Sequence, residues 1–186
     1  MSHDIGRTLS NLRRSIAALT CAAAPSKKMS LLSLKQTVGV SGAEAFVVAD
    51  HFKVDTSEKA KVKIAYLSTN FTTHFMSKRE DNVPAGELNI HTLLESSVDT
   101  PIIDELGARY KTYFADLWAL LEKQPNGEGG SLRVNRRHNI LYIEGPDGKF
   151  WKVLAYWDAS DGGWCVYGHS FEKQFLWGAG SVVVSR

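Results

Sequence analysis

Cysteine and histidine side chains occur close together near the end of the chain, in the stretch FWKVLAYWDASDGGWCVYGHSF (150–171). Cys165 and His169 are residue types that form the nucleophile and base of cysteine-dependent enzymes. On one strand, however, four residues at about 3.3 Å each separate them by roughly 13 Å, whereas nucleophile and base must come within about 3 Å. His91 or His138 could approach from another strand, but no spacing requires it. We therefore assign no catalytic residue.

Metal and phosphate chemistry have no matching motif. The six histidines, at positions 3, 51, 74, 91, 138 and 169, never fall in the His-x-x-x-His spacing that pre-places ligands on a helix, and the two cysteines form no Cys-x-x-Cys pair. The glycine-rich NGEGGS (126–131) lacks the Lys-Ser/Thr of a phosphate loop and is predicted to be a turn. We assign no metal ligand and no cofactor.

A basic patch is formed by Arg133, Arg136, Arg137 and His138, beside Tyr142. Such a pairing of cations with an aromatic ring can grip nucleic acid. Arginines at a strand edge also prevent edge-to-edge pairing, and this structural role is the alternative explanation of the patch.

Residues 1–80 carry twelve Lys/Arg and six Asp/Glu, and the remainder carries ten and fourteen, so the small net charge of +2 hides a basic front half. Nucleic-acid binding through this half is the last-ranked of three functional hypotheses.

The composition is typical of a soluble globular protein, with 44% hydrophobic and 23% charged residues in 186. This length predicts a single domain over 1–186, mainly helical in 1–80 and a strand, a helix and a meander in 87–186. No stretch approaches the roughly 20 apolar residues of a membrane span. Two distant cysteines, Cys21 and Cys165, indicate reduced thiols and a cytoplasmic protein.

Helical periodicity dominates the front half. Ile5, Leu9, Leu12, Ile16 and Leu19 form one stripe that ends before Pro25. A signal peptide over 1–24 is the alternative. Further stripes predict a short helix from the capping box at 41–44 to about Phe52, and another after 55–58 whose stripe is Ala60, Ile64, Leu67, Phe71 and Phe75.

One long helix is predicted from the N-cap Asp99 to about Lys123. Its stripe is Ile103, Leu106, Tyr110, Phe114, Leu117 and Leu121. Strands are predicted at ELNIHTLL (87–94), NILYIE (139–144), KFWKVLAYW (149–157), WCVYGHSF (164–171) and GSVVVSR (180–186).

This order of elements predicts an α+β fold, with N-terminal helices and the long helix packed on one face of a curved antiparallel sheet. The order of a strand, a long helix and a meander resembles the cystatin-like and nuclear-transport-factor-like architectures. The resemblance is one of architecture and implies no function.

The aromatic stretch is predicted to be a hairpin turning at DASDGG (158–163), which places Trp157 opposite Trp164. One face then holds Trp151, Val153, Ala155, Trp157, Trp164 and Val166, carries no charge, and is predicted to be core. The other face holds Phe150, Lys152, Leu154, Tyr156, Cys165, Tyr167, His169 and Phe171.

Aromatic side chains with polar tips suit a binding surface. We take Phe150, Lys152, Tyr156, Tyr167, His169 and Phe171 as candidate binding residues. The leading hypothesis is a non-catalytic module that docks a protein partner on this face. The alternative function is a small-molecule pocket or an enzyme site between helices and sheet. The alternative explanation of the face is burial under a second covering layer, which would leave no binding surface there.

Overall fold

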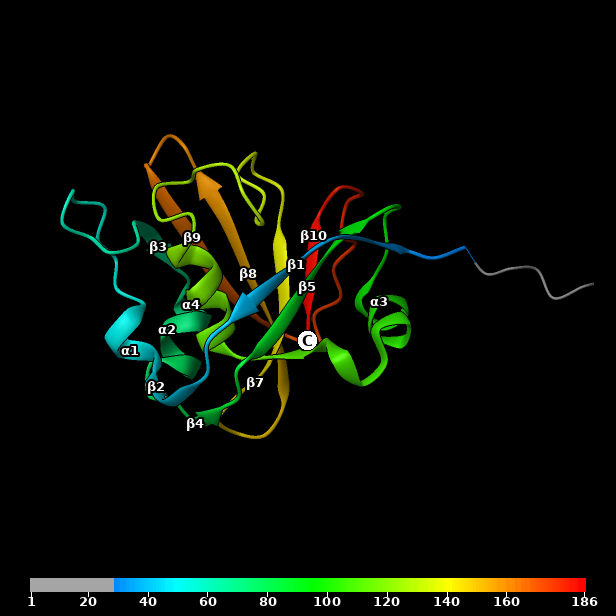
Figure 1. The fold of residues 1–186 in the computed structure, drawn as a ribbon, viewed down its shortest axis with the longest axis horizontal. Helices are drawn as coiled ribbons and strands as arrows, with labels where there is room; N and C mark the ends of the chain where they lie inside the picture. Colours follow the sequence, from blue (N-terminus) through cyan, green and yellow to red (C-terminus); the bar gives the residue numbers. More distant parts are fainter. Residues whose placement is uncertain (1–28) are drawn as a thin grey trace, which may run out of the picture.

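The computed structural model describes residues 29–186 and contains an eight-stranded mixed sheet (Figure 1). The helix predicted from the stripe over residues 5–19 lies outside the described residues. In spatial order the strands are β1 (Leu32–Val40), β5 (Gly86–Leu93), β10 (Val182–Ser185), β7 (Asn139–Glu144), β8 (Phe150–Asp158), β9 (Gly163–Ser170) and β3 (Ile64–Leu67), with β6 (Lys111–Thr112) beside β7. A separate two-stranded sheet pairs β2 (Ala43–Val47) with β4 (Arg79–Val83).

The predicted antiparallel sheet is correct for the meander β7–β8–β9 and for β1, β5 and β10. It is wrong for the sheet as a whole, because β10 runs parallel to β7, β6 parallel to β7, and β3 parallel to β9. These parallel pairs join segments far apart in the chain, which hairpin signals cannot predict. The α+β class is confirmed.

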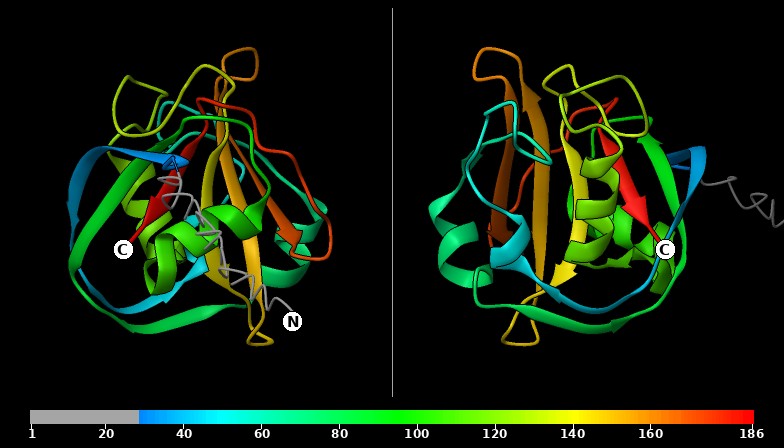
Figure 2. Two further views of the ribbon diagram at one scale, coloured as in Figure 1. Left: turned by 90° about the vertical axis from the view of Figure 1, so that its right-hand side faces the viewer. Right: turned by 60° about the vertical axis from the view of Figure 1, so that its left-hand side comes forward.

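The helices are short and lie on both sides of the sheet (Figures 1 and 2). They are α1 (Val48–His51), α2 (Thr69–Phe75), α3 (Asp99–Leu106) with the 3₁₀ turn η1 (Gly107–Tyr110), and α4 (Phe114–Glu122). The face of the sheet that packs on α1, α2 and α4 is called the inner face, and the face under α3 the outer face. The sequence predicts helices on a single face, and this prediction is wrong.

Two hydrophobic cores result, one on each face. On the sheet, the inner core takes Leu88, Ile90, Leu141, Ile143, Val153, Ala155, Trp164, Val166, Val182 and Val184. The outer core takes Leu93, Ile140, Tyr142, Leu154 and Val183, under Ile102 and Leu106 of α3. Because central strands are covered on both faces, five of the six residues of β7 are buried, which explains its nearly continuous apolar run.

The long helix predicted over 99–123 is wrong: it is broken at Gly107, whose φ of 58° lies in the left-handed region that favours glycine. The chain then crosses the end of the sheet through β6 and restarts as α4. The predicted stripe is thereby divided, since Leu106 packs in the outer core and Phe114, Leu117 and Leu121 pack in the inner core. The signal for the break is the glycine inside the helical pattern.

Carboxylates fix where α4 begins. The buried Glu80 of β4 accepts the N–H groups of Phe114 and Ala115 at 2.9 and 3.0 Å. Asp116 caps the N–H of Tyr113 at 3.0 Å and also pairs with Arg186 at 2.5 Å. The first turn of a helix has unpaired N–H donors, so these acceptors stabilise the break in the predicted helix.

The front half is not mainly helical between residues 29 and 80. The helix predicted from the capping box at 41–44 to about Phe52 is strand β2 over Ala43–Val47 and helical only in α1. The helix predicted over 58–75 is strand β3 at 64–67 and helical only in α2, whose N-cap Ser68 accepts the N–H of Phe71 at 3.2 Å. β2 pairs with β4 and β3 pairs with β9, and this pairing outweighs the helical periodicity of both segments. The partner strands are distant in the chain, so the local pattern does not reveal them.

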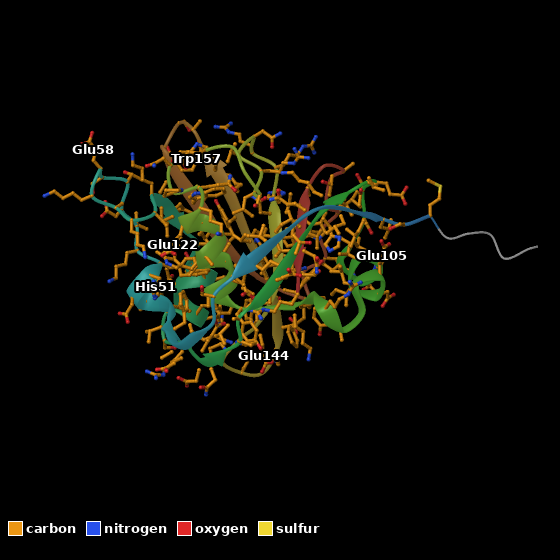
Figure 3. The ribbon with its side chains drawn as sticks, in the orientation of Figure 1. His51, Glu58, Glu105, Glu122, Glu144 and Trp157 are labelled. Atoms are coloured by element: carbon orange, nitrogen blue, oxygen red, sulfur yellow. The ribbon has the colours of Figure 1, made fainter. Side chains whose placement is uncertain are left out.

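The N-terminal end of β1 is tied to α3. Glu105 of α3 (Figure 3) accepts hydrogen bonds from the N–H groups of Leu31 and Leu32 at 2.7 and 3.0 Å.

Within residues 29–186, no helix has the length and apolar character that a membrane crossing needs.

Truncation of the inner core at Phe114 tests this packing. Phe114 is fully buried and its ring lies 5.0 Å from that of Phe75 and 5.6 Å from that of Phe71. We expect Phe114→Ala to lower the free energy of unfolding by about 3–5 kcal/mol in urea denaturation, because it leaves a cavity. Leu176→Ala, at a side chain that is 72% exposed, is the control and should change it by less than about 0.5 kcal/mol. Equal effects of both changes would contradict the packing.

Candidate functional site

The hairpin β8–β9 has the register predicted from its turn. Trp157 pairs with Trp164, Tyr156 with Cys165, Leu154 with Tyr167 and Lys152 with His169. The predicted core face is confirmed, since Trp151, Val153, Ala155, Trp164 and Val166 are buried in the inner core and the half-buried Trp157 packs against it. The candidate residues therefore share the outer face.

The outer face is partly covered by α3 and by the segment 171–181 that leads to β10 (Figure 2). The cover divides the candidate residues into three groups: a buried ion pair at Lys152, an aromatic cluster around Tyr156, Tyr167 and His169, and a pocket at Phe150 and Phe171. A covering layer is one of the alternatives that the sequence leaves open, and the residues that the structure describes bury only part of the face.

Lys152 has no exposed side-chain surface and pairs with Asp99 of α3, Nζ to Oδ2 at 3.0 Å. Asp99 also accepts a hydrogen bond from the Tyr142 hydroxyl at 3.1 Å and from the Trp177 indole N–H at 2.7 Å. One carboxylate thus receives donors from two strands and from the covering segment. A buried charge needs such partners, because an unpaired one costs several kcal/mol.

The remaining contacts of the Lys152 ammonium are also inside the protein. It donates to the carbonyl of Lys173 and lies 4.9 Å from the ring centre of Phe175 and 5.7 Å from that of Phe171. Aromatic faces and carbonyls stabilise a desolvated cation. The structure therefore places Lys152 beneath the surface as an anchor of the cover.

The outer aromatic cluster comprises Tyr66, His138, Tyr156, Tyr167, His169, Phe175 and Trp177. Six of these rings contact one another in a closed circuit: Tyr156–Tyr167 (5.8 Å), Tyr167–His169 (6.1 Å), His169–Phe175 (4.7 Å), Phe175–Trp177 (5.3 Å), Trp177–His138 (5.7 Å) and His138–Tyr156 (6.1 Å). Tyr66 of edge strand β3 extends it, 5.4 Å from Tyr167. Leu154, opposite Tyr167 in the register, belongs to the outer core, against which Tyr167 and Phe175 pack.

The cluster is partly accessible. Tyr66 is 43% exposed and the neighbouring Leu176 is 72% exposed, while Tyr156, Tyr167, His169 and Phe175 are half-buried. The Tyr156 and Tyr167 hydroxyls lie 3.3 Å apart. The ring contacts hold the circuit in place, and five of its six rings stay partly exposed, whereas Trp177 is buried.

Burial lowers the pKa of both histidines in the cluster below the ordinary value. For His138 the second cause is the charge of Arg137, and for His169 it is the charges of Lys173 and Lys152. The hydrogen bond with Tyr167, together with burial, raises the pKa of Tyr156. At neutral pH the cluster is therefore an uncharged surface.

Phe150 and Phe171 lie apart from the cluster, in a pocket of about 850 Å³ where β8 begins and β9 ends. We call it the end pocket. Its other lining residues are Asn70, His74, Ile103, Tyr110, Asp147, Gly148, Lys149, Trp151, Ser170 and Glu172. They come from α2, α3, η1, the β7–β8 turn, β8, the end of β9 and the start of the covering segment, which no sequence spacing links.

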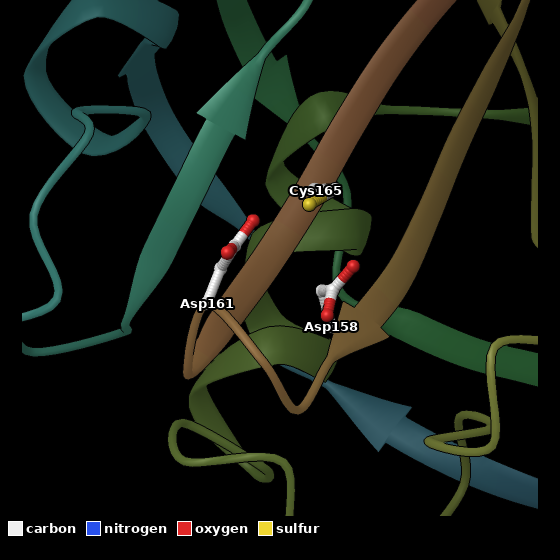
Figure 4. A group of neighbouring side chains, drawn as sticks. All are labelled: Asp158, Asp161 and Cys165. Atoms are coloured by element: carbon white, nitrogen blue, oxygen red, sulfur yellow. The ribbon is translucent and has the colours of Figure 1, made fainter.

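Cys165 is buried and its thiol is free. Its Sγ atom and one carboxylate oxygen each of Asp158 and Asp161 lie within 4.8 Å of one another (Figure 4). Thiol and carboxylates are possible metal ligands. Asp158 Oδ1, however, already accepts from Ser160 N–H at 2.9 Å and Arg136 at 3.2 Å. Burial raises the pKa of Cys165, which opposes the thiolate that a nucleophile or ligand needs.

The basic patch does not form one surface. Arg136 pairs with Asp158. The guanidinium of Arg137 lies beside Gly178, so close that a Cβ added to this glycine would be 3.1 Å from it. The Nε of Arg133 is buried. Arg136 and Arg137 thus have different neighbours.

Several residues of these sites carry no signal in the sequence. Asp99 is predicted only as a helix cap, and Tyr66, Phe175 and Trp177 are assigned no role. Trp177 and Tyr66 reach the cluster through a loop and a parallel edge strand, so alternation along the hairpin gives no signal for either.

A double-mutant cycle tests the ion pair. We expect Lys152→Met to lower the free energy of unfolding by about 3 kcal/mol, because it leaves the Asp99 carboxylate buried without its cation. Adding Asp99→Asn should restore at least half of that loss, measured by urea denaturation. Additive losses in the double variant would contradict the coupling.

The stability of the protein should also depend on pH through its buried histidines. The folded-state pKa of His138 and His169, like that of His51 and His91, is below the ordinary value of 6.5. The unfolded chain therefore takes up protons first, so stability is full above pH 6.5 and falls as pH decreases toward the folded-state values. We expect the Tm to fall between about pH 7.5 and 5.5 and to fall less in a His138→Gln/His169→Gln variant. An identical slope in both proteins would contradict this assignment.

Comparison with models of protein families, with curated proteins and with solved structures gives no match for this chain. The residues of the outer face are therefore the basis for any functional assignment.

Proposed function

We propose that the protein is a non-catalytic interaction module that docks a protein partner on the outer aromatic cluster. The observation that carries this proposal is the closed circuit of ring contacts, with Tyr66 and Leu176 exposed beside it. Tyrosine and other aromatic side chains dominate the binding energy of protein interfaces because they bury much area with few rotatable bonds.

The preformed geometry supports the same function. Each ring of the circuit touches at least two others, so little side-chain entropy is left to lose on binding. The paired hydroxyls of Tyr156 and Tyr167 give the surface polar tips, and the neutral histidines leave it free of charge to desolvate. An uncharged aromatic centre with polar tips is the composition of an interface core.

On the side of the covering segment, charge favours an acidic partner, whereas the Asp158 and Asp161 carboxylates lie at the hairpin turn near Tyr156. Lys173 lies 5.1 Å from the Phe175 ring, and Arg137 lies beside Gly178, next to Trp177. These cations border the cluster on the side of the covering segment. Rim charges steer association more than they add affinity, so association with the partner should slow as salt increases.

The finer architecture and the location belong to the same proposal. A cystatin-like or nuclear-transport-factor-like arrangement is supported by the meander β7–β8–β9 with α4 on its inner face, and the break between α3 and α4 is the feature that departs from it. A cytoplasmic location is supported by the free thiol of Cys165. Nucleic-acid binding is not favoured, because Arg136 is paired with Asp158.

Affinity capture with surface variants tests the proposal. The 186-residue chain and its Tyr66→Ala, Tyr167→Ala and Leu34→Ala variants are used to capture proteins from native extract, followed by quantitative mass spectrometry. Leu34, 56% exposed on β1 at the opposite edge of the sheet, is the matched control. We expect at least one acidic protein to be recovered with wild type and Leu34→Ala and reduced about tenfold or more by each tyrosine variant.

Two results would overturn the proposal. One is an identical set of captured proteins for all four chains. The other is a loss of stability for Tyr167→Ala as large as that for Trp164→Ala, since Trp164 is fully buried in the inner core. The cluster would then be a second core layer rather than a docking surface.

A further inference from the structure

The end pocket is a second candidate binding site, separate from the aromatic cluster. Its volume of about 850 Å³ lies within the range of pockets that enclose small ligands. It lies between α2 on one side and the α3–η1 segment on the other, against the first residues of β8. A ligand there would contact residues from four parts of the chain.

The walls of the pocket are aromatic and fixed by their neighbours. Tyr110 and Phe150 meet edge to face at 5.1 Å, and Phe171 stacks on the buried Tyr142 at 5.7 Å. Trp151 packs against His74 at 4.5 Å. The Lys111 ammonium lies 5.1 Å from the centre of the Phe150 ring. These contacts hold the rings of the pocket in place before a ligand binds.

The polar groups of the pocket are hydrogen-bonding groups of mixed charge. The lining groups include neutral amide and hydroxyl groups, two carboxylates, one ammonium group and one imidazole: Asn70, Ser170, Tyr110, Asp147, Glu172, Lys149 and His74. An anionic ligand would meet the two carboxylates and a cationic ligand would meet the ammonium group. A purely apolar ligand would remove the amide and hydroxyl from water without giving them a partner, which costs free energy.

We propose that the end pocket binds a neutral sugar ring of an oligosaccharide. A pyranose has a face of C–H groups that can pack on an aromatic ring, and hydroxyls at its edge that both donate and accept hydrogen bonds. The C–H face matches Phe150 and Phe171, and the hydroxyls match Asn70, Ser170 and the carboxylates. A neutral polyhydroxylated ring uses both kinds of group and is opposed by neither charge.

Titration by NMR tests this inference on the full chain. Trp151 is the tryptophan of this pocket among five in the sequence, so its indole N–H resonance, assigned with Trp151→Phe, reports binding. The probes are cello-, malto-, chito- and xylotetraose, with benzyltrimethylammonium and benzoate as charged aromatic comparisons. We expect at least one sugar to shift this resonance with a Kd below about 10 mM, with weaker binding of both charged probes.

Variants decide whether the binding is at this site. Phe150→Ala and the exposed Asn70→Ala should each weaken binding about tenfold, whereas Tyr66→Ala in the aromatic cluster should leave it unchanged. The Tyr66→Ala control separates this inference from the proposed partner docking, which that variant is expected to weaken about tenfold or more. The inference is overturned if no sugar shifts the Trp151 resonance, if a charged probe binds more tightly than every sugar, or if Asn70→Ala binds as wild type.

Discussion

The buried carboxylate of Asp99 is the group on which the outer half of the molecule depends. It accepts hydrogen bonds from Lys152 of β8, Tyr142 of β7 and Trp177 of the covering segment, and it stands at the first residue of α3. Because neither charge of the pair can remain buried without the other, α3 and the covering segment are held on the sheet at one position. That position leaves part of the outer face uncovered.

The parts of this arrangement that a sequence can predict are those fixed by short-range geometry. The turn at 158–163 sets the register of β8 and β9, and alternation then assigns every hairpin side chain to a face. For this reason the amino-acid sequence alone correctly predicts the core face of the hairpin and the shared face of Lys152, Tyr156, Tyr167 and His169. The hairpin needs no information from the rest of the chain.

The parts that could not be predicted depend on partners distant in the chain. Ile64 and Leu67 fit a helical stripe with Phe71 and Phe75, yet they form a strand because β9 offers an edge. Asp99 and Lys152 are 53 residues apart, and no spacing rule pairs them. Gly107 does carry a local signal, since glycine within a helical pattern often ends a helix, and its positive φ explains the division of the long helix.

The ion pair also links the two candidate sites. The Lys152 ammonium contacts Phe171, which lines the end pocket, and Phe175, which belongs to the aromatic cluster. A change at Lys152 or Asp99 would therefore disturb both sites together with the fold. Tyr66 lies at the edge of the cluster, and Asn70 lies on α2 on the far side of the pocket, so each belongs to one site without contacting the pair. One ring from each site thus contacts the same buried ammonium group. Only substitutions at residues away from this group, such as Tyr66 and Asn70, can therefore test one site without changing the other.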